Sequence, residues 1–227
     1  MSISAKDKES IRLRYLEVDT SNVADVLDNM NLLQQGLAAD FGPYPETCKR
    51  MAGWAYTIRG QMTPYPQGGD KDKMEACQGL SPGEISVWSG NGEGICYFGE
   101  LIALGMKERG CVGALLDGGI RDVRWIGEHQ FPVFARYKTS VQSIGRWKVN
   151  ACQVPVYMRG HDGGNVIVRF HAAANCHRPK PRPATNVPAA AEAARGRDPG
   201  CGRRCRGSHR GRFGRRRFCG ERRRRRG

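Results

Sequence analysis

The large apolar side chains of this chain stop almost entirely at Phe170. The residues that follow, 171–227, contain no Leu, Ile, Met, Trp or Tyr. A segment with so little apolar surface cannot offset the entropy that it would lose on ordering. We therefore predict one folded domain over residues 1–170 and a disordered, basic tail over residues 171–227.

The charge of the chain changes at the same position. Residues 1–170 hold 19 Lys and Arg against 19 Asp and Glu, whereas residues 171–227 hold 18 against 3 and carry the whole net charge of +15. The basic balance therefore describes the tail alone. It excludes a basic nucleic-acid-binding body and leaves only binding through the tail.

The tail has two interactions of its own to offer. The run Arg222–Arg226 would bind RNA or DNA non-specifically by neutralising phosphates. Cys201, Cys205 and His209, with Cys219 beyond, are a candidate zinc site, and accidental cysteines in an arginine-rich tract are the alternative.

Nothing in the sequence indicates a membrane. No apolar run approaches the ~20 residues that a span needs, and Met1–Lys8 lacks the apolar stretch of a signal peptide. The body holds an odd number of cysteines, which we interpret as buried thiols in a reducing compartment. They are Cys48, Cys77, Cys96, Cys111 and Cys152. The sequence thus predicts a cytoplasmic protein.

Helical and strand patterns alternate along the body, which is typical of an α/β domain with some parallel pairing. We expect helices at residues 10–35 (ending at Gly36), 71–80, 99–110 and 123–128, and strands at 51–58, 84–89, 111–117, 131–135, 149–158 and 166–169. Loops rich in glycine or proline are expected at 42–45, 64–70 and 118–122.

Arg121 and Asp122 follow an apolar strand and two glycines, at the edge of the sheet where α/β folds usually meet ligands. Asp is a hard oxygen ligand that suits Mg²⁺ or Mn²⁺, and Arg presents a planar fork of donors to a carboxylate. Together they can hold an anionic, metal-chelating small molecule. A surface ion pair or a helix N-cap is the alternative, and the dipeptide by itself favours that alternative.

The segment Gly99–Ile102 opens a predicted helix, whose first N–H groups lack a helical partner and form an anion site. Gly99 lets a ligand approach the backbone, and Glu100 is the nearest carboxylate for a metal or its water. An ordinary helix start with an acidic first turn is the alternative. Twenty residues separate Glu100 from Arg121, which is enough for one helix and one strand. Glu100 and Arg121 are therefore expected at the same rim of the sheet.

Several motifs occur together and in order in the body. They are Asn22–Asp28, Met51–Arg59, Ser81–Glu84, Gly99–Leu101, Gly113–Asp122, Phe131–Ala135 and Val149–Asn150. With them, the sequence from about Val18 to Arg169 resembles the class II, divalent-metal-dependent aldolases acting on 4-hydroxy-4-methyl-2-oxoglutarate and 4-carboxy-4-hydroxy-2-oxoadipate. This RraA-like family also includes regulator of ribonuclease E activity A. The most specific element of the resemblance is an acidic residue, Glu100, followed after twenty residues by the dipeptide Arg121-Asp122.

The resemblance implies a layered β/β/α swivelling-domain fold, assembled as a homotrimer or homohexamer (a dimer of trimers) with active sites between subunits. It implies that Asp122 binds the metal, Mg²⁺ first with Mn²⁺ or Co²⁺ as alternatives, and that Glu100 lies near the metal's water. The implied substrate-binding residues are Gly99, Glu100, Leu101, Ile102 and Arg121, of which Arg121 holds the α-keto acid.

The reaction implied by the resemblance is retro-aldol cleavage to pyruvate, in aromatic degradation. The metal acts as a Lewis acid and stabilises the enolate left when the C–C bond breaks. No Schiff-base lysine is needed, so Lys107 and Lys138 have no expected catalytic role. Oxaloacetate decarboxylation passes through the same enolate and is an expected side activity. The alternative is a non-catalytic protein that inhibits a ribonuclease, and the acid at Glu100 favours chemistry.

The sequence departs from the family in two places. After Arg169 the family usually continues with a Pro-Gly-Asp turn and a final strand, whereas this chain continues with Phe170–Ala174 and the basic tail. We interpret the change as translation in a shifted reading frame. The final strand, and a C-terminal acid lent to the neighbouring subunit, then have no match. Trp125 also stands where many relatives have an acid.

Overall fold

The computed structural model describes residues 3–48, 50–64 and 71–169. Our predictions for the tail (its disorder, its zinc and nucleic-acid alternatives and its shifted frame) lie outside these residues, as does most of the predicted loop 64–70. The boundary at residue 170 therefore stays a prediction.

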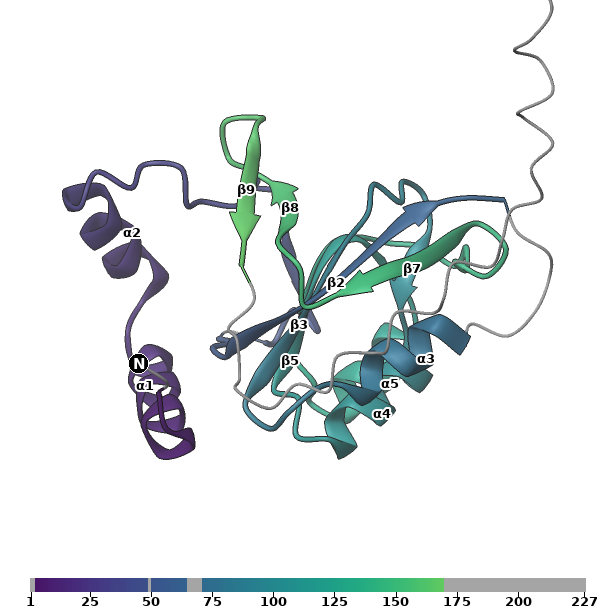
Figure 1. Cartoon of the computed structure of the whole chain (residues 1–227), viewed down its shortest axis with the longest axis horizontal. Helices are drawn as coiled ribbons and strands as arrows, with labels where there is room; N and C mark the ends of the chain where they lie inside the picture. Colours follow the sequence, from purple (N-terminus) through teal and green to yellow (C-terminus); the bar gives the residue numbers. More distant parts are fainter. Residues whose placement is uncertain (1–2, 49, 65–70, 170–227) are drawn as a thin grey trace, which may run out of the picture. The chain divides into compact units, whose positions relative to one another are not determined.

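A mixed seven-stranded sheet forms the centre of the body (Figure 1). In spatial order its strands are β1 (Gly42–Tyr44), β6 (Val133–Lys138), β5 (Gly113–Ile120), β3 (Glu84–Ser89), β2 (Trp54–Met62) and β7 (Trp147–Cys152), with β4 (Cys96–Phe98) paired to β5 beside this path. Neighbouring pairs among β2, β3, β5 and β6 are parallel, and so is the β4–β5 pair. The edge strands β1 and β7 pair in the antiparallel direction.

Two layers cover this sheet. Helices α3 (Lys71–Gln78), α4 (Glu100–Glu108) and α5 (Val123–Glu128) lie together on one face (Figure 1), over a core that includes Trp88, Trp147 and Phe98. The hairpin of β8 (Val156–Arg159) and β9 (Asn165–Val168) covers the other face, where Val156 and Met158 pack on Ile85 and Val87. Hairpin, sheet and helices give the predicted β/β/α layering, and the α/β fold class is confirmed.

Most predicted elements of the body are found. The helices expected at 71–80, 99–110 and 123–128 and the strands expected at 51–58, 84–89, 131–135 and 166–169 match α3, α4, α5, β2, β3, β6 and β9, with ends that shift by a few residues. β3 is buried on both faces along its whole length, so its polar residues Glu84, Ser86 and Ser89 are buried together with its apolar ones. All five cysteines of the body are free thiols, of which Cys48 and Cys152 are only half-buried. None of the helices among the described residues is long and apolar enough to cross a membrane.

The predicted helix at 10–35 is wrong in two respects. It is two helices, α1 (Ala5–Glu17) and α2 (Thr20–Asn29), because Val18 and Asp19 both take extended backbone angles. The second helix ends at Asn29 rather than at Gly36, since Asn31 adopts the left-handed conformation with φ 60°. Neither helix contributes a buried residue.

Three predicted strand boundaries also need correction. The expected loop at 42–45 contains β1, and the expected strand at 149–158 is interrupted at Gln153, whose φ is 55°, so that β7 and β8 are separate. The strand predicted at 111–117 continues to Ile120 as β5. Gly118 and Gly119 are there for packing, because a Cβ on either would come within 2.5 or 2.6 Å of a tyrosine ring, Tyr97 or Tyr137.

Glu84, the buried first residue of β3, gives a pH-dependent prediction. Burial raises the pKa of its carboxyl. Two weaker influences lower that pKa: the Ser81 N–H, which donates to Glu84 Oε2 at 2.7 Å, and the positive charge of Lys8. The folded chain therefore binds this proton more tightly than the unfolded chain, and ionisation lowers stability as the pH rises through and above the ordinary carboxyl pKa. We expect Glu84→Gln, which can accept the same hydrogen bond, to raise the Tm at neutral pH. At about pH 3.5, where the carboxyl is protonated in both states, the gain should vanish. An equal gain at both pH values would contradict this cause.

Candidate functional site

The predicted site lies where β4 and β5 end side by side. β4 runs parallel to β5 and leads through Gly99 into α4, while β5 leads through Arg121 and Asp122 into α5. The Arg121 N–H donates to the carbonyl oxygen of Phe98 at 3.0 Å, which holds the two strand ends together. The structure thus brings the segment Gly99–Ile102 next to Arg121 and Asp122, as the spacing of these residues suggested.

The Asp122 carboxylate closes the start of α4. Its Oδ2 accepts a hydrogen bond from the Glu100 backbone N–H at 3.0 Å and lies 3.3 Å from Arg121 Nε. Asp122 itself takes the left-handed conformation, with φ 55° and ψ 34°, and its side chain does not cap α5, the helix that it precedes. Asp122 thus holds the N-cap position of α5 but caps α4 with its side chain. The ion pair between Arg121 and Asp122 is present, and Asp122 also contacts the start of α4.

Gly99 is required by this arrangement. A Cβ on Gly99 would stand 2.5 Å from Asp122 Oδ2 and 3.0 Å from Arg121 Cγ. The glycine therefore makes room for the Asp122 and Arg121 side chains, and the close approach of a ligand at Gly99 stays a prediction.

We expect Gly99→Ala to displace the Asp122 carboxylate and to weaken Mn²⁺ binding at least about tenfold, as loss of a group that orients a metal ligand does. Gly105→Ala in the same helix is the matched control, because its Cβ would meet only Arg109 Nη1, at 3.6 Å. That control should raise the free energy of unfolding by about 0.5–1 kcal/mol and leave Mn²⁺ binding unchanged. Calorimetric titration with Mn²⁺ beside a melting curve measures both. Equal Mn²⁺ affinity in Gly99→Ala and the native chain would show that Gly99 does not shape the site.

The predicted anion site at the start of α4 is partly used. The Glu100 N–H points to Asp122. The next two N–H groups, of Leu101 and Ile102, lie in the first turn, where a helix offers them no backbone acceptor. The Glu100 side chain is exposed, and the side chains of Arg121 and Asp122 are 42% and 37% exposed. A small anion can therefore reach a guanidinium and two backbone donors at one place.

The donor set suits Mg²⁺ or Mn²⁺ in an open site. These ions usually take one or two carboxylates and fill the remaining positions with water or substrate oxygens. Asp122 and Glu100 supply two carboxylates at one rim, and the described contacts of Asp122 use Oδ2 only. Over the described ranges, no three or more His, Cys, Asp or Glu side chains gather in a way that would hold a metal ion. The residues therefore fit an ion that shares its coordination with a ligand, and they do not form a closed cage.

The departure at Trp125 has a local explanation. Its ring stacks on that of His129, one turn later in the chain, with centroids 3.8 Å apart and planes at 16°. Trp125 packs against the main core and, as an indole, supplies no oxygen ligand for a metal.

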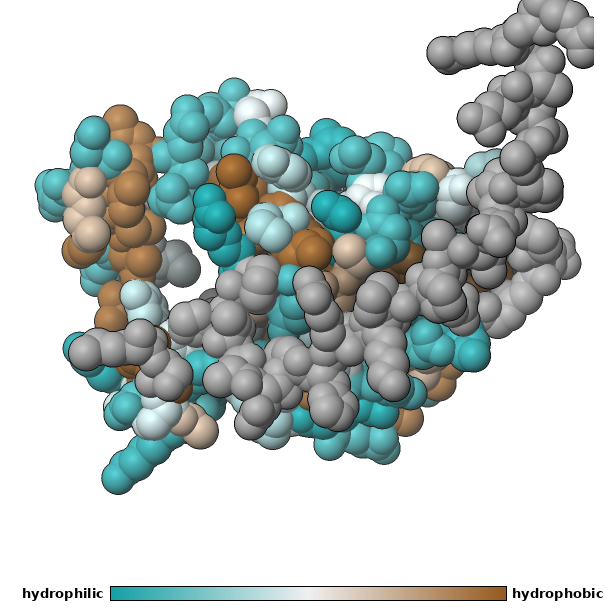
Figure 2. All heavy atoms as spheres, viewed as in Figure 1, coloured by the Kyte–Doolittle hydropathy of each residue, from teal (hydrophilic) through white to brown (hydrophobic). Residues whose placement is uncertain are grey.

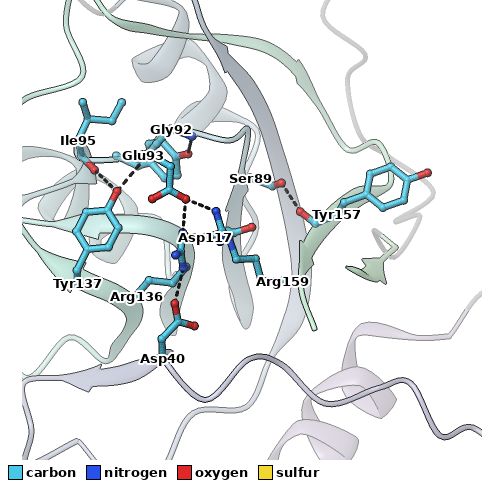
Figure 3. Close-up of polar contacts among 11 residues, drawn as sticks. Asp40, Ser89, Gly92, Glu93, Ile95, Asp117, Arg136, Tyr137, Tyr157 and Arg159 are labelled. Carbon is cyan, nitrogen blue, oxygen red and sulfur yellow. Dashed lines mark hydrogen bonds and ion pairs between the residues drawn. The ribbon is translucent and has the colours of Figure 1, made fainter. Parts of the chain in front are cut away.

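A second polar cluster was not predicted from the sequence. Asp117 stands within the apolar run of β5 beside Arg136 and Arg159, and both of these arginines pair with Glu93 (Figure 3). A charged residue inside a buried strand is the signal that marks it, since such a carboxylate needs partners.

The chain is similar to one family model and to several solved structures. The family model described as "RraA-like: Aldolase/RraA" matches residues 20–168, more than half of the chain. A structure titled as novel cellulases from microbes associated with the gut ecosystem has a TM-score of 0.64 at 24% identity, covering 75% of this chain and 73% of that chain.

Two further solved structures are similar. An uncharacterised protein from Pseudomonas syringae pv. tomato str. DC3000 has a TM-score of 0.61 at 19% identity, covering 75% of this chain and 71% of its own. Streptomyces coelicolor RraAS2 is described as an unusual member of the RNase ES inhibitor RraA protein family. It has a TM-score of 0.55 at 20% identity, and the match covers 74% of this chain and 87% of RraAS2. At these identities the structures show a common fold.

Proposed function

This chain belongs to the RraA-like (Aldolase/RraA) family, and from that premise we propose that it is a metal-dependent lyase releasing pyruvate from 4-hydroxy-2-oxo di- and tricarboxylic acids. Oxaloacetate decarboxylation is the proposed side activity. The contact that carries the proposal is the one between Asp122 Oδ2 and the Glu100 N–H, because it joins an acid pair, an arginine and a helix start in one open site.

Substrate binding follows from the donors of the site. The Arg121 guanidinium offers its fork to the α-keto acid, and the N–H groups of Leu101 and Ile102 face the substrate carboxylate. Asp122, with Glu100 beside it, would hold the divalent ion. When bound, that ion supplies Lewis-acid polarisation of the keto oxygen.

Glu100 is the proposed proton acceptor. Retro-aldol cleavage removes the proton of the 4-hydroxyl group, breaks the C3–C4 bond and leaves an electron pair on the pyruvate fragment, which is then protonated at C3. An exposed carboxylate beside the site can take the first proton through a water and return one to C3. Decarboxylation of oxaloacetate needs only the second of these transfers.

A second copy of the chain is the proposed partner. The family resemblance implies an oligomer, and we propose a homotrimer or a dimer of trimers here. Figure 2 shows apolar side chains gathered in the region of α2, where Val26 is exposed, as is Met30 directly after the helix. Leu101, beside the site on α4, is 66% exposed. Burial of these side chains between copies would remove their apolar surface from water. A cytoplasmic location stays a prediction.

The test is release of pyruvate by the full chain, coupled to lactate dehydrogenase, with 4-hydroxy-4-methyl-2-oxoglutarate and with oxaloacetate as substrates. We expect activity with Mg²⁺ or Mn²⁺ and its loss on addition of EDTA. Activity that EDTA leaves unchanged would overturn the metal-dependent mechanism.

Inhibition of a ribonuclease is the second candidate, favoured by the similarity to Streptomyces coelicolor RraAS2. The same preparation is therefore added to a ribonuclease E-type assay. Inhibition together with no pyruvate release from either substrate would support this candidate and contradict the lyase.

A further inference from the structure

A second site lies away from the residues proposed for the lyase. A pocket of about 510 Å³ opens between the segment before β1, the loop after β3 and the turn of the β8–β9 hairpin. Its polar side chains are Asp40, Asn91, Asp117, Arg159 and Asn165, several of which Figure 3 shows together. Glu100, Arg121 and Asp122 are not among the residues that line it.

Asp117 is the unusual member of this pocket. It is 7% exposed, and its Oδ1 accepts no hydrogen bond from any part of the chain that the structure describes. The nearest cationic atoms, Arg136 Nη1 and Arg159 Nε, are 3.6 and 3.8 Å away, beyond hydrogen-bond distance. Burial raises the pKa of this carboxyl, against the two guanidinium groups and a hydrogen bond from the Arg159 backbone N–H to the carboxylate. A buried carboxylate oxygen without a donor is costly, so the pocket lacks a hydrogen-bond donor at this atom.

Other acids hold the two arginines in place. Arg136 bonds Asp40 and Glu93, each at 2.7 Å, and Arg159 pairs with the same Glu93 (Figure 3). These contacts hold both guanidinium groups beside Asp117 Oδ1, at distances too long for a hydrogen bond to that atom. The missing donor must therefore come from outside this network.

The charges of the cluster select the kind of donor. Three carboxylates face two guanidinium groups, which disfavours an anion and so disfavours the α-keto acids proposed for the other site. An ammonium group or a metal ion at Oδ1 would meet the two flanking guanidinium groups and be repelled. A neutral hydroxyl avoids both costs, since it donates to a carboxylate and accepts from a guanidinium at the same time.

The rest of the lining suits several hydroxyl groups. Asn91 and Asn165 each offer an amide donor and acceptor, and the glycines of the hairpin turn leave backbone groups accessible. Ala38 and Ala39 are the only apolar side chains among the lining residues. We propose that this pocket binds a neutral polyol of the size of a monosaccharide, with one hydroxyl donating to Asp117 Oδ1 and accepting from Arg159.

The test is binding of D-glucose, D-ribose and myo-inositol to the full chain, measured by saturation-transfer NMR and calorimetry. We expect a millimolar or tighter Kd for at least one of them and at least a tenfold loss in Asp117→Asn. Asp162→Asn is the matched control, because Asp162 accepts from Gly164 N within the same turn and does not line the pocket. It should bind the polyol like the native chain.

A second variant and two cationic probes complete the experiment. Asn91 has φ 54°, so Asn91→Gly removes its amide without straining the backbone, and it should weaken the same polyol severalfold even where Asp117→Asn fails to fold. Putrescine and Mn²⁺ serve as cationic probes. Absence of binding by all three polyols, unchanged affinity in both variants, or binding of the cations alone at this pocket would overturn the proposal. Since the readout is binding, failure here is separate from failure of pyruvate release.

Discussion

Asp122→Asn is expected to remove metal-dependent pyruvate release by more than about a hundredfold while the chain stays folded. Asn tolerates the left-handed backbone of this position, with φ 55°, and its amide oxygen can still accept from the Glu100 N–H at the start of α4. The variant therefore loses the charge that would bind the ion and keeps the geometry. Asp122→Ala loses both, so it separates the two contributions.

Arg121→Lys is the contrasting variant. It keeps a positive charge but loses the planar fork, so Mn²⁺ binding should persist while catalytic efficiency falls by about one to two decades, or roughly 1.5–3 kcal/mol. Metal affinity by calorimetry, steady-state kinetics and a melting curve for each variant measure these effects. If Asp122→Asn binds Mn²⁺ like the native chain, the pair is structural and the site assignment is wrong.

Trp88→Ala is expected to cause the largest loss of stability, about 3–5 kcal/mol. Trp88 is fully buried on β3 and packs edge-on against Phe98 and at an angle against Trp147, with ring centroids 6.1 and 6.2 Å apart. A small domain is stable by only about 5–15 kcal/mol, so the variant should unfold at much lower urea concentration. Chemical denaturation followed by circular dichroism measures the change.

Trp88→Phe tests the cause of that loss. Within the described residues the Trp88 indole N–H has no hydrogen-bond partner, so its removal costs nothing and partly offsets the smaller ring. We expect Trp88→Phe to be at least about 2 kcal/mol more stable than Trp88→Ala. Equal destabilisation by the two substitutions would mean that the indole N–H contributes to the fold.

Local sequence signals predicted best the elements that are bounded by clear turn or helix-ending residues. The turn Ser81–Gly83 separates α3 from β3, and Gly110, with φ 81°, ends the helical segment before β5. The boundaries that failed depend on contacts far along the chain. Gly118 and Gly119 suggested a loop, but neighbouring tyrosine rings require a residue without a side chain there. Local signals carry no information about such contacts.

The candidate site shows the same limit. The types and spacing of Glu100, Arg121 and Asp122 predicted that they meet at one rim, because a helix and a strand lie between them. That Asp122 caps α4 instead of α5 depends on the β4–β5 pairing, which no local pattern indicates. The cluster around Asp117 was missed for a similar reason, since Arg136 and Arg159 come from β6 and β8, which are distant from Asp117 along the chain.

Binding of oxalate tests the central claim most directly, because this planar diacid resembles the enol form of pyruvate and binds without turnover. Calorimetric titration of oxalate into the full chain is carried out with Mn²⁺, with EDTA, and with Mn²⁺ in Asp122→Asn. We predict tight binding in the first titration and loss of binding in the other two. Equal oxalate affinity with Mn²⁺ and with EDTA would contradict a metal-dependent keto-acid site at Asp122.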